Sequence, residues 1–405
     1  MVVRLQSVGG WRKLKKYFIN RAVIYRSFFL GLLVKIKTLE TFSNKYVSFV
    51  KITTDTNDVG WGQMSTYNAD ITSQIFHRQV SPWSIGLELD EEKPNFSDHL
   101  QIILEREHKF PGSYLLRALS GLDTALWDLY GNLKEKPVAS LIGGGPGKIR
   151  VYGSSMRRDI TSINESIRLC KLRDELGINA FKFRVGSECG RDKDEWDGRS
   201  KEIVKTLSRD LGNKVDKLVD GNSCFSPEKA IELGKFMQDM GVTHFEEPCP
   251  YWEHDQTKVV KEALEIDVAG GEQDCDMSTW KSTLQKRIVD IAQPDVMYMG
   301  GMYRTLEVAN MANKIGLPCT PHAANLSLVT ICTKHLLTAI PNAGKYLEFS
   351  IEDETYYPWQ KDIFNGDPFK IVDGFIEVTN EPGWGVQINS NWLEHAKYEI
   401  SEGTE

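Results

Sequence analysis

From residue 149 onward the chain alternates between short apolar runs and amphipathic stretches, and this alternation restricts the fold more than any other feature. The runs have the length of buried strands, and the stretches between them, such as residues 227–240 and 303–315, have helical apolar spacing. The runs lie at residues 149–152, 180–185, 217–220, 243–246, 266–269, 289–292, 318–320 and 346–349. Strand–helix alternation is typical of parallel β/α units, and eight strands can close a barrel. The pattern predicts an α/β barrel, with a doubly wound open sheet as the alternative.

Charged or ionisable side chains lie at or near the ends of most runs, and this placement favours the barrel. They are Lys182, Arg184, Asp220, Glu246, Glu272, Asp295, His322 and Glu348. A barrel gathers the carboxyl ends of its strands around one mouth, whereas an open sheet spreads them along an edge. We therefore expect these side chains to face a single pocket. The alternative is that they are ordinary polar residues where a strand meets a loop.

Three of the carboxylates among them, Asp220, Glu246 and Glu272, lie in consecutive units. Carboxylates that face one another repel and raise each other's pKa unless a cation lies between them. Mg²⁺ takes oxygen ligands and keeps open positions for water or substrate, whereas histidine or thiolate ligands would indicate zinc. The three acids therefore predict a Mg²⁺ site.

The remaining groups predict acid–base chemistry on an anionic substrate. A carboxylate such as Asp295, bonded to one imidazole nitrogen of His322, would fix the ring's tautomer and raise its basicity. Lys182 and Arg184 are two residues apart, so in a strand they share a face. A positive pair opposite a metal suits a small-molecule carboxylate, and Glu348 completes the ring.

Residues 34–148 follow a different pattern. Alternation over residues 34–39 and 46–54 predicts antiparallel strands, and leucine spacing over residues 115–133 predicts a helix. The glycine-rich run at residues 143–147 lacks the spacing of a phosphate-binding loop, so we interpret it as a domain boundary. The barrel domain is then expected over residues 149–369.

Charge and cysteine content limit the partners and the location. The chain carries 49 basic and 56 acidic side chains, a net charge of −7, which argues against a nucleic-acid partner. No apolar run reaches the roughly 18 residues of a membrane span. The seven dispersed cysteines include no C-x-x-C pair, which favours a cytoplasmic location over a disulfide framework. Residues 1–33 are basic and free of acids; we expect a poorly ordered extension, with a targeting or membrane-surface segment as the alternative.

Taken in order, these motifs resemble the enolase superfamily, in the branch of mandelate racemase and the acid-sugar dehydratases. The motifs are Phe181-Lys182-Phe183-Arg184, Asp220-Gly221-Asn222, Phe245-Glu246-Glu247-Pro248, Gly270-Gly271-Glu272-Gln273, Gln293-Pro294-Asp295, Gly300-Gly301, Pro321-His322 and Leu347-Glu348. The resemblance implies a (β/α)7β TIM-like barrel with an α+β capping domain, built from residues 34–148 and the tail at 370–405. It also implies a symmetric homo-oligomer and capping loops near residues 42–46 and 61–67 that close over the mouth.

The resemblance further implies a reaction. In this family a carboxylate substrate binds Mg²⁺, a base removes the proton α to the carboxylate, and the metal stabilises the enediolate. The metal ligands would be Asp220, Glu246 and Glu272, and Glu348 would contact the substrate carboxyl group.

One position departs from the family pattern. Racemases of this branch usually have a lysine as a base where this chain has Arg184, and arginine stays protonated because its pKa is above about 12. Only the His322–Asp295 pair is then plainly fit to act as a base, while Lys182 would bind the carboxylate and Arg184 would bind substrate or stabilise charge. One-base chemistry favours β-elimination of water from an aldonate or aldarate, which makes the protein a hydro-lyase. The alternatives are a racemase or epimerase of a 2-hydroxy acid and a non-catalytic, metal-containing sugar-acid-binding protein.

Overall fold

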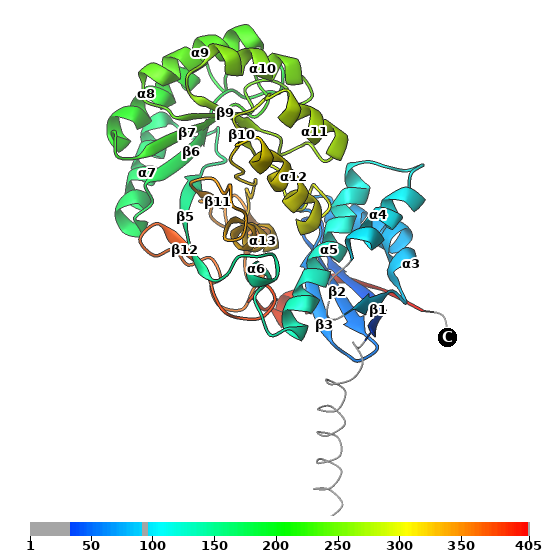
Figure 1. Cartoon of the computed structure of the whole chain (residues 1–405). Helices are drawn as coiled ribbons and strands as arrows, with labels where there is room; N and C mark the ends of the chain where they lie inside the picture. The colour runs from blue at the N-terminus through cyan, green and yellow to red at the C-terminus, as the bar shows by residue number, and fades with distance from the viewer. Residues whose placement is uncertain (1–32, 91–95, 404–405) are drawn as a thin grey trace, which may run out of the picture.

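The computed structural model describes residues 33–90 and 96–403, which form a barrel lobe and a smaller α+β lobe beside it (Figure 1). One continuous cluster of buried apolar side chains runs through both lobes, so they share a core. The basic extension predicted for residues 1–33 lies outside the described residues, apart from Leu33, which begins the first strand.

The α+β lobe is built on an antiparallel sheet. Strands β1 (Leu33–Ser43), β2 (Ser48–Thr54) and β3 (Val59–Gln63) are neighbours in chain order, and β4 (Glu88–Asp90) pairs with the start of β1. The long helix α5 (Ser113–Leu133) packs on this sheet. It approaches β3 so closely that a Cβ at Gly60 would lie 2.3 Å from the carbonyl oxygen of Ala125. The antiparallel strands and the helix predicted here are therefore present.

Short helices complete this lobe. They are α2 (Ala69–Ile75), the π-helix η1 (Phe76–Val80), α3 (Ser81–Ser84), α4 (Ser97–Arg106) and α6 (Val138–Leu141).

The barrel lobe alternates strands and helices as predicted. Its parallel strands are β5 (Gly147–Ser154), β6 (Ala180–Arg184), β7 (Asp216–Asp220), β8 (His244–Glu246), β9 (Asp267–Gly270), β10 (Ile291–Ala292) and β11 (Leu347–Ser350). The helices are α7 (Ser162–Leu176), α8 (Arg199–Leu211), α9 (Pro227–Asp239), α10 (His254–Ala263), α11 (Met277–Gln285), α12 (Met302–Lys314) and α13 (Leu328–Leu337). Seven helices between eight strand positions give the (β/α)7β order.

The seventh strand position, predicted at residues 318–320, is held by isolated bridges. Cys319 bridges Ala292 of β10 on one side and Ala343, just before β11, on the other. Strand β11 pairs with β5, so this segment links the two ends of the sheet. Between β10 and β11 the strands are therefore connected by single-residue bridges, one of which joins Asp295 and His322.

The C-terminal tail divides between the two lobes. Its strand β12 (Phe375–Val378) pairs antiparallel with β5 at the base of the barrel, whereas β13 (Lys397–Glu402) adds an edge to the capping sheet beside β1. The short elements η2 (Pro358–Gln360) and α14 (Ser390–Glu394) lie between the barrel strands and β13. The prediction that residues 370–405 complete the capping domain therefore describes β13 but not β12, because β12 joins the barrel.

A buried carboxylate joins the lobes. Asp123, in α5, accepts a 2.6 Å hydrogen bond from the backbone N–H of Met302, the first residue of α12. It therefore satisfies a helix N-terminus that belongs to the other lobe. Gly301 allows this approach, because a Cβ there would lie 2.2 Å from the Asp123 carboxylate.

No helix within residues 33–90 and 96–403 has both the length and the apolar character that crossing a membrane requires.

We expect the substitution Asp123→Ala to destabilise the protein by about 2–3 kcal/mol, because it leaves buried N–H groups without an acceptor and removes a helix cap. Thermal melting of the two variants checks this, with Asp197→Ala at an exposed turn as the control. Equal melting temperatures for Asp123→Ala and the control would contradict a joining role for Asp123.

Candidate active site

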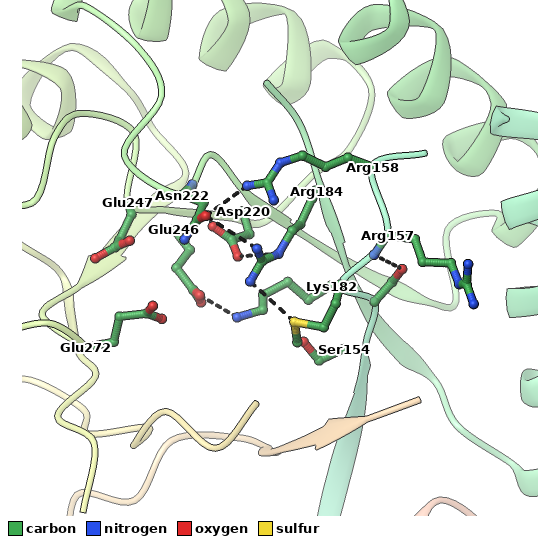
Figure 2. Close-up of polar contacts among 12 residues, drawn as sticks. Ser154, Arg157, Arg158, Lys182, Arg184, Asp220, Asn222, Glu246, Glu247 and Glu272 are labelled. Atoms are coloured by element: carbon green, nitrogen blue, oxygen red, sulfur yellow. Dashed lines mark hydrogen bonds and ion pairs between the residues drawn. The ribbon is translucent and has the colours of Figure 1, made fainter. Parts of the chain in front are cut away.

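The barrel register places the predicted functional residues side by side at one end. Arg184, the last residue of β6, pairs with Asp220, the last residue of β7, and Asp220 pairs with Glu246, the last residue of β8. Asp295 and His322 are joined by a parallel bridge. Glu272 follows β9 by two residues, Glu348 lies in β11 and Lys182 points into the same region from β6 (Figure 2). All eight predicted residues therefore lie at the same end of the barrel.

The three predicted metal ligands each face a different partner. Asp220 lies 3.4 Å from Arg184 Nε, Glu246 forms an ion pair with Lys182, and Glu272 lies 3.3 Å from His322 Nε2. Within residues 33–90 and 96–403, no three acidic, histidine or cysteine side chains are arranged as a metal-binding group. The acids share one end of the barrel, but in this conformation they do not point at one common centre.

The acids at the mouth nevertheless outnumber the cations. Six buried carboxylates lie there, whereas the cationic partners among the predicted residues are Lys182, Arg184 and His322. The acids are Asp220, Glu246, Glu247, Glu272, Asp295 and Glu348. Burial raises the pKa of Glu272, and the Glu246 and Asp220 carboxylates raise it further against the effect of His322. Burial also raises the pKa of Glu247 well above its ordinary value, and Glu272 and Asp220 act in the same direction.

The donor set fits a hard divalent cation. Asp220, Glu246 and Glu272 offer only oxygen atoms, which Mg²⁺ prefers. Two further observations agree, since Asp220 Oδ2 and Glu247 Oε1 are buried and have no hydrogen-bond partner. A cation at these acids would offset the repulsion that helps to raise the pKa values of Glu272 and Glu247. Glu247 adjoins the predicted ligand Glu246, and its role as a fully buried member of this cluster was not predicted.

Asp295 holds the imidazole of His322 in a fixed orientation. Its Oδ2 lies 2.7 Å from His322 Nδ1, and its Oδ1 accepts backbone N–H groups from Met297 at 2.7 Å and Tyr298 at 2.9 Å. His322 Nε2 is thereby aimed at Glu272. Although burial lowers the pKa of His322, Glu272, Glu348 and Asp295 outweigh it and raise that pKa to about 10. The ring is therefore protonated at neutral pH until another cation offsets the Glu272 charge.

Lys182 lies between two acids. Its Nζ forms ion pairs with Glu246 and with Glu348, the latter at 2.8 Å. Although burial opposes the shift, the Lys182 ammonium holds the pKa of Glu246 well below its ordinary value. Glu348 also accepts hydrogen bonds from Ser154 Oγ and Ala323 N, each at 2.8 Å. To bind substrate as predicted, Lys182 or Glu348 would have to break at least one of these contacts and form a contact with the substrate in its place.

Arg184 is placed as a cation and not as a base. Besides Asp220, its guanidinium contacts Asn222 Oδ1 at 3.3 Å and Met156 Sδ at 3.3 Å. Burial lowers its pKa, but the Asp220 and Glu272 carboxylates outweigh burial and raise the pKa above its ordinary value. The surroundings of Arg184 thus make it less able to accept a proton than a free arginine.

Three features of the mouth were not predicted. Gln293 Nε2 donates a 2.6 Å hydrogen bond to Glu246. Arg158, which follows β5, donates to Asn222 Oδ1 at 2.9 Å. An aromatic run at residues 356–359 lies near Arg184. Of these three features, only the aromatic run could have been identified from the sequence, because three of its four residues are aromatic and it follows the last predicted strand.

The capping loops meet this aromatic run. Tyr46 stacks on Trp359 with ring centroids 6.2 Å apart, and Tyr67 meets the same ring edge-on at 6.0 Å. Gln63 donates a 2.9 Å hydrogen bond to Ser327, five residues beyond His322. The segments expected near residues 42–46 and 61–67 therefore contact the barrel loops that border the site.

Comparison with known proteins places this geometry in a family. The model described as "Mandelate racemase / muconate lactonizing enzyme, N-terminal domain" matches residues 34–143, and the model described as "Enolase C-terminal domain-like" matches residues 165–392. An arabinonate dehydratase from Saccharolobus solfataricus is 27% identical over 360 residues, which cover 86% of this chain and 89% of that protein.

Two solved structures share the fold. A "putative racemase" from Roseobacter denitrificans is 56% identical with a TM-score of 0.88, over 91% of this chain and 100% of that one. A mandelate racemase/muconate lactonizing protein from Paracoccus denitrificans, crystallised with magnesium, is 23% identical with a TM-score of 0.80, over 91% of this chain and 98% of that one. With its capping region and most of its barrel matched, the chain belongs to the enolase superfamily, as the order of its motifs predicted.

Proposed function

We propose that the protein is a Mg²⁺-dependent acid-sugar dehydratase, which removes the proton α to a carboxylate and eliminates the β-hydroxyl group as water. One observation carries the proposal: the mouth holds one oriented imidazole, His322, while Arg184 stands where a second base would be needed. The relative from Saccharolobus solfataricus named as an arabinonate dehydratase supports the same reaction class.

Asp220, Glu246 and Glu272 would hold the metal ion, and when bound the ion would supply positive charge beside the substrate carboxylate. The magnesium in the Paracoccus denitrificans structure supports this assignment. Offsetting the Glu272 charge also has a local effect on His322, because Glu272 is the largest contributor that raises the imidazole pKa. His322 would then be able to release its Nε2 proton and act as a base.

In the first step His322 Nε2 takes the α-proton while Asp295 holds the proton on Nδ1. In the second step the electron pair left on the α-carbon forms a double bond to the β-carbon as the β-hydroxyl group leaves. The same imidazole returns its proton to that leaving group, so water departs and an enol remains. The enol tautomerises to a 2-keto-3-deoxy acid, and the enzyme regains its starting protonation state.

Racemisation is the second candidate, because the Roseobacter denitrificans relative is described as a "putative racemase". It requires a competent base on each face of the α-carbon. The acids around Arg184 raise its pKa, so this position offers no such base. A non-catalytic sugar-acid-binding protein is the third candidate, and it predicts binding without turnover.

The remaining expectations concern the setting of the enzyme. The seven cysteines are all free thiols, which supports a reducing, cytoplasmic location. The homo-oligomeric state and the absence of nucleic-acid and membrane partners remain predictions.

The proposal predicts solvent deuterium exchange at the α-carbon of acid sugars, accompanied by a keto-acid product, when the protein is incubated with Mg²⁺. Mass spectrometry and a keto-acid assay over a panel of aldonates and aldarates check both results. Exchange with inversion and without keto acid would indicate the racemase. Absence of both across the panel would favour the binding protein.

His322→Asn should lower turnover by at least about 10²-fold, because a general base typically contributes 10²–10⁴-fold. The buried His335 in α13 offers a matched control, since His335→Asn lies away from the mouth and should retain α-proton exchange if it folds. Full turnover by His322→Asn would exclude the mechanism even if the reaction class survived.

Mg²⁺ should raise the melting temperature in a saturable way, because an ion bound only to the folded state stabilises it by about 2.7 kcal/mol at 100 times its Kd. Glu272→Gln should lose most of this rise, whereas Glu195→Gln, at an exposed position, should keep it. A Mg²⁺ response of wild-type size in Glu272→Gln would contradict the ligand assignment.

A further inference from the structure

The loop after β5 carries two adjacent arginines that point in different directions. Arg157 forms ion pairs with Glu352 at 3.2 Å and with two exposed aspartates, and it points away from the mouth (Figure 2). Arg158 turns the other way, toward Asn222 and Arg184 (Figure 2). Only the second arginine therefore faces the site.

Arg158 is held by neutral groups alone. Its Nε donates to the carbonyl oxygen of Gly186 at 3.2 Å, and its Nη2 donates to Asn222 Oδ1 at 2.9 Å. Within residues 33–90 and 96–403 it forms no ion pair, whereas the adjacent Arg157 forms three. A guanidinium group has five N–H donors, so three remain available to a ligand.

Arg158 and Arg184 form one positive rim. Both donate to the same oxygen, Asn222 Oδ1. Burial and the nearby Arg184 charge lower the pKa of Arg158, although the Asp220 carboxylate acts in the opposite direction. An anion between the two guanidinium groups would compensate both.

Of the two arginines, Arg158 lies beyond the acids of the mouth. Ser154, the last residue of β5, pairs in register with Lys182, and Arg158 is four residues farther along the chain. Arg184 lies in register with Asp220 at the edge of the acidic cluster, and Arg158 continues the positive charge beyond it. A substrate whose reacting carboxylate lies beside these acids would place its far end near Arg158.

We propose that Arg158, together with Arg184, forms a second anion subsite that binds the carboxylate at the far end of the substrate. This inference rests on the proposed function and selects aldarates, which carry a carboxylate at each end, over aldonates. The planar fork of a guanidinium group matches a carboxylate through two parallel hydrogen bonds. The neutral hydroxyl end of an aldonate would leave the charge of Arg158 without a counter-ion.

The test compares a hexaric acid with the hexonic acid of the same configuration. Wild-type protein should have a kcat/KM at least about tenfold higher for the diacid. Arg158→Gln should lower kcat/KM for the diacid by about 10–100-fold, chiefly through KM, because charge-assisted hydrogen bonds contribute about 1.5–3 kcal/mol. For the monoacid, Arg158→Gln should change kcat/KM by less than about threefold. Arg158→Lys should fall between these variants for the diacid, and Arg157→Gln should affect both acids alike.

Three outcomes would overturn the subsite. They are a wild-type preference for the monoacid, an equal loss for both acids in Arg158→Gln, and a preference for a hexonic acid with a terminal phosphate over the diacid. If wild-type protein turns over neither acid, the proposed function fails, and calorimetric titration of the same acids tests the subsite alone. Binding of the diacid that weakens at least tenfold in Arg158→Gln would support the subsite, and equal binding by both proteins would overturn it.

Discussion

Six carboxylates buried at one end of the barrel, more than the cations that face them, constrain the rest of this structure. These acids come from five strand ends, with Glu246 and Glu247 adjacent on one of them, so the register of the sheet keeps them together. Lys182 offsets the charge of Glu246 and Glu348, while Arg184 lies beside Asp220. Buried charges that lack partners carry a large free-energy cost. A divalent cation among the oxygen-only ligands is the arrangement that best relieves it.

The same charge excess links metal binding to catalysis. Glu272 faces His322 and raises its pKa, so in the proposed reaction the imidazole becomes a better base when that carboxylate binds the metal ion. Arg184 keeps its proton for the corresponding reason, because the acids nearby favour its charged form. Under the proposed function, one face of the substrate would meet a base and the other a fixed cation, which accords with elimination. Farther out, Arg158 provides a positive charge whose direct hydrogen-bond partners are neutral groups.

Much of the fold and of the candidate site followed from local sequence pattern. The predicted helix at residues 115–133 corresponds to α5, and the strand ends supplied all eight residues now found at the mouth. The spacing of strand–helix units was sufficient to predict these residues, because a barrel brings the carboxyl ends of regularly spaced strands together at one mouth. The pairing of β12 with β5 was not predicted, since a contact between residues more than 200 positions apart has no local signal. The ion pairs of Lys182 and the orientation of Arg158 could not be predicted from the sequence. They depend on which charged and polar groups lie nearby in three dimensions.

A crystal structure with Mn²⁺ in place of Mg²⁺ tests the central claim most directly, because anomalous scattering locates the ion. We predict a single strong anomalous peak within about 2.3 Å of oxygen atoms from Asp220, Glu246 and Glu272, with Glu272 turned away from His322. A peak at another position, or a mouth in which Glu272 still faces His322 and no ion is bound at saturating Mn²⁺, would contradict the account.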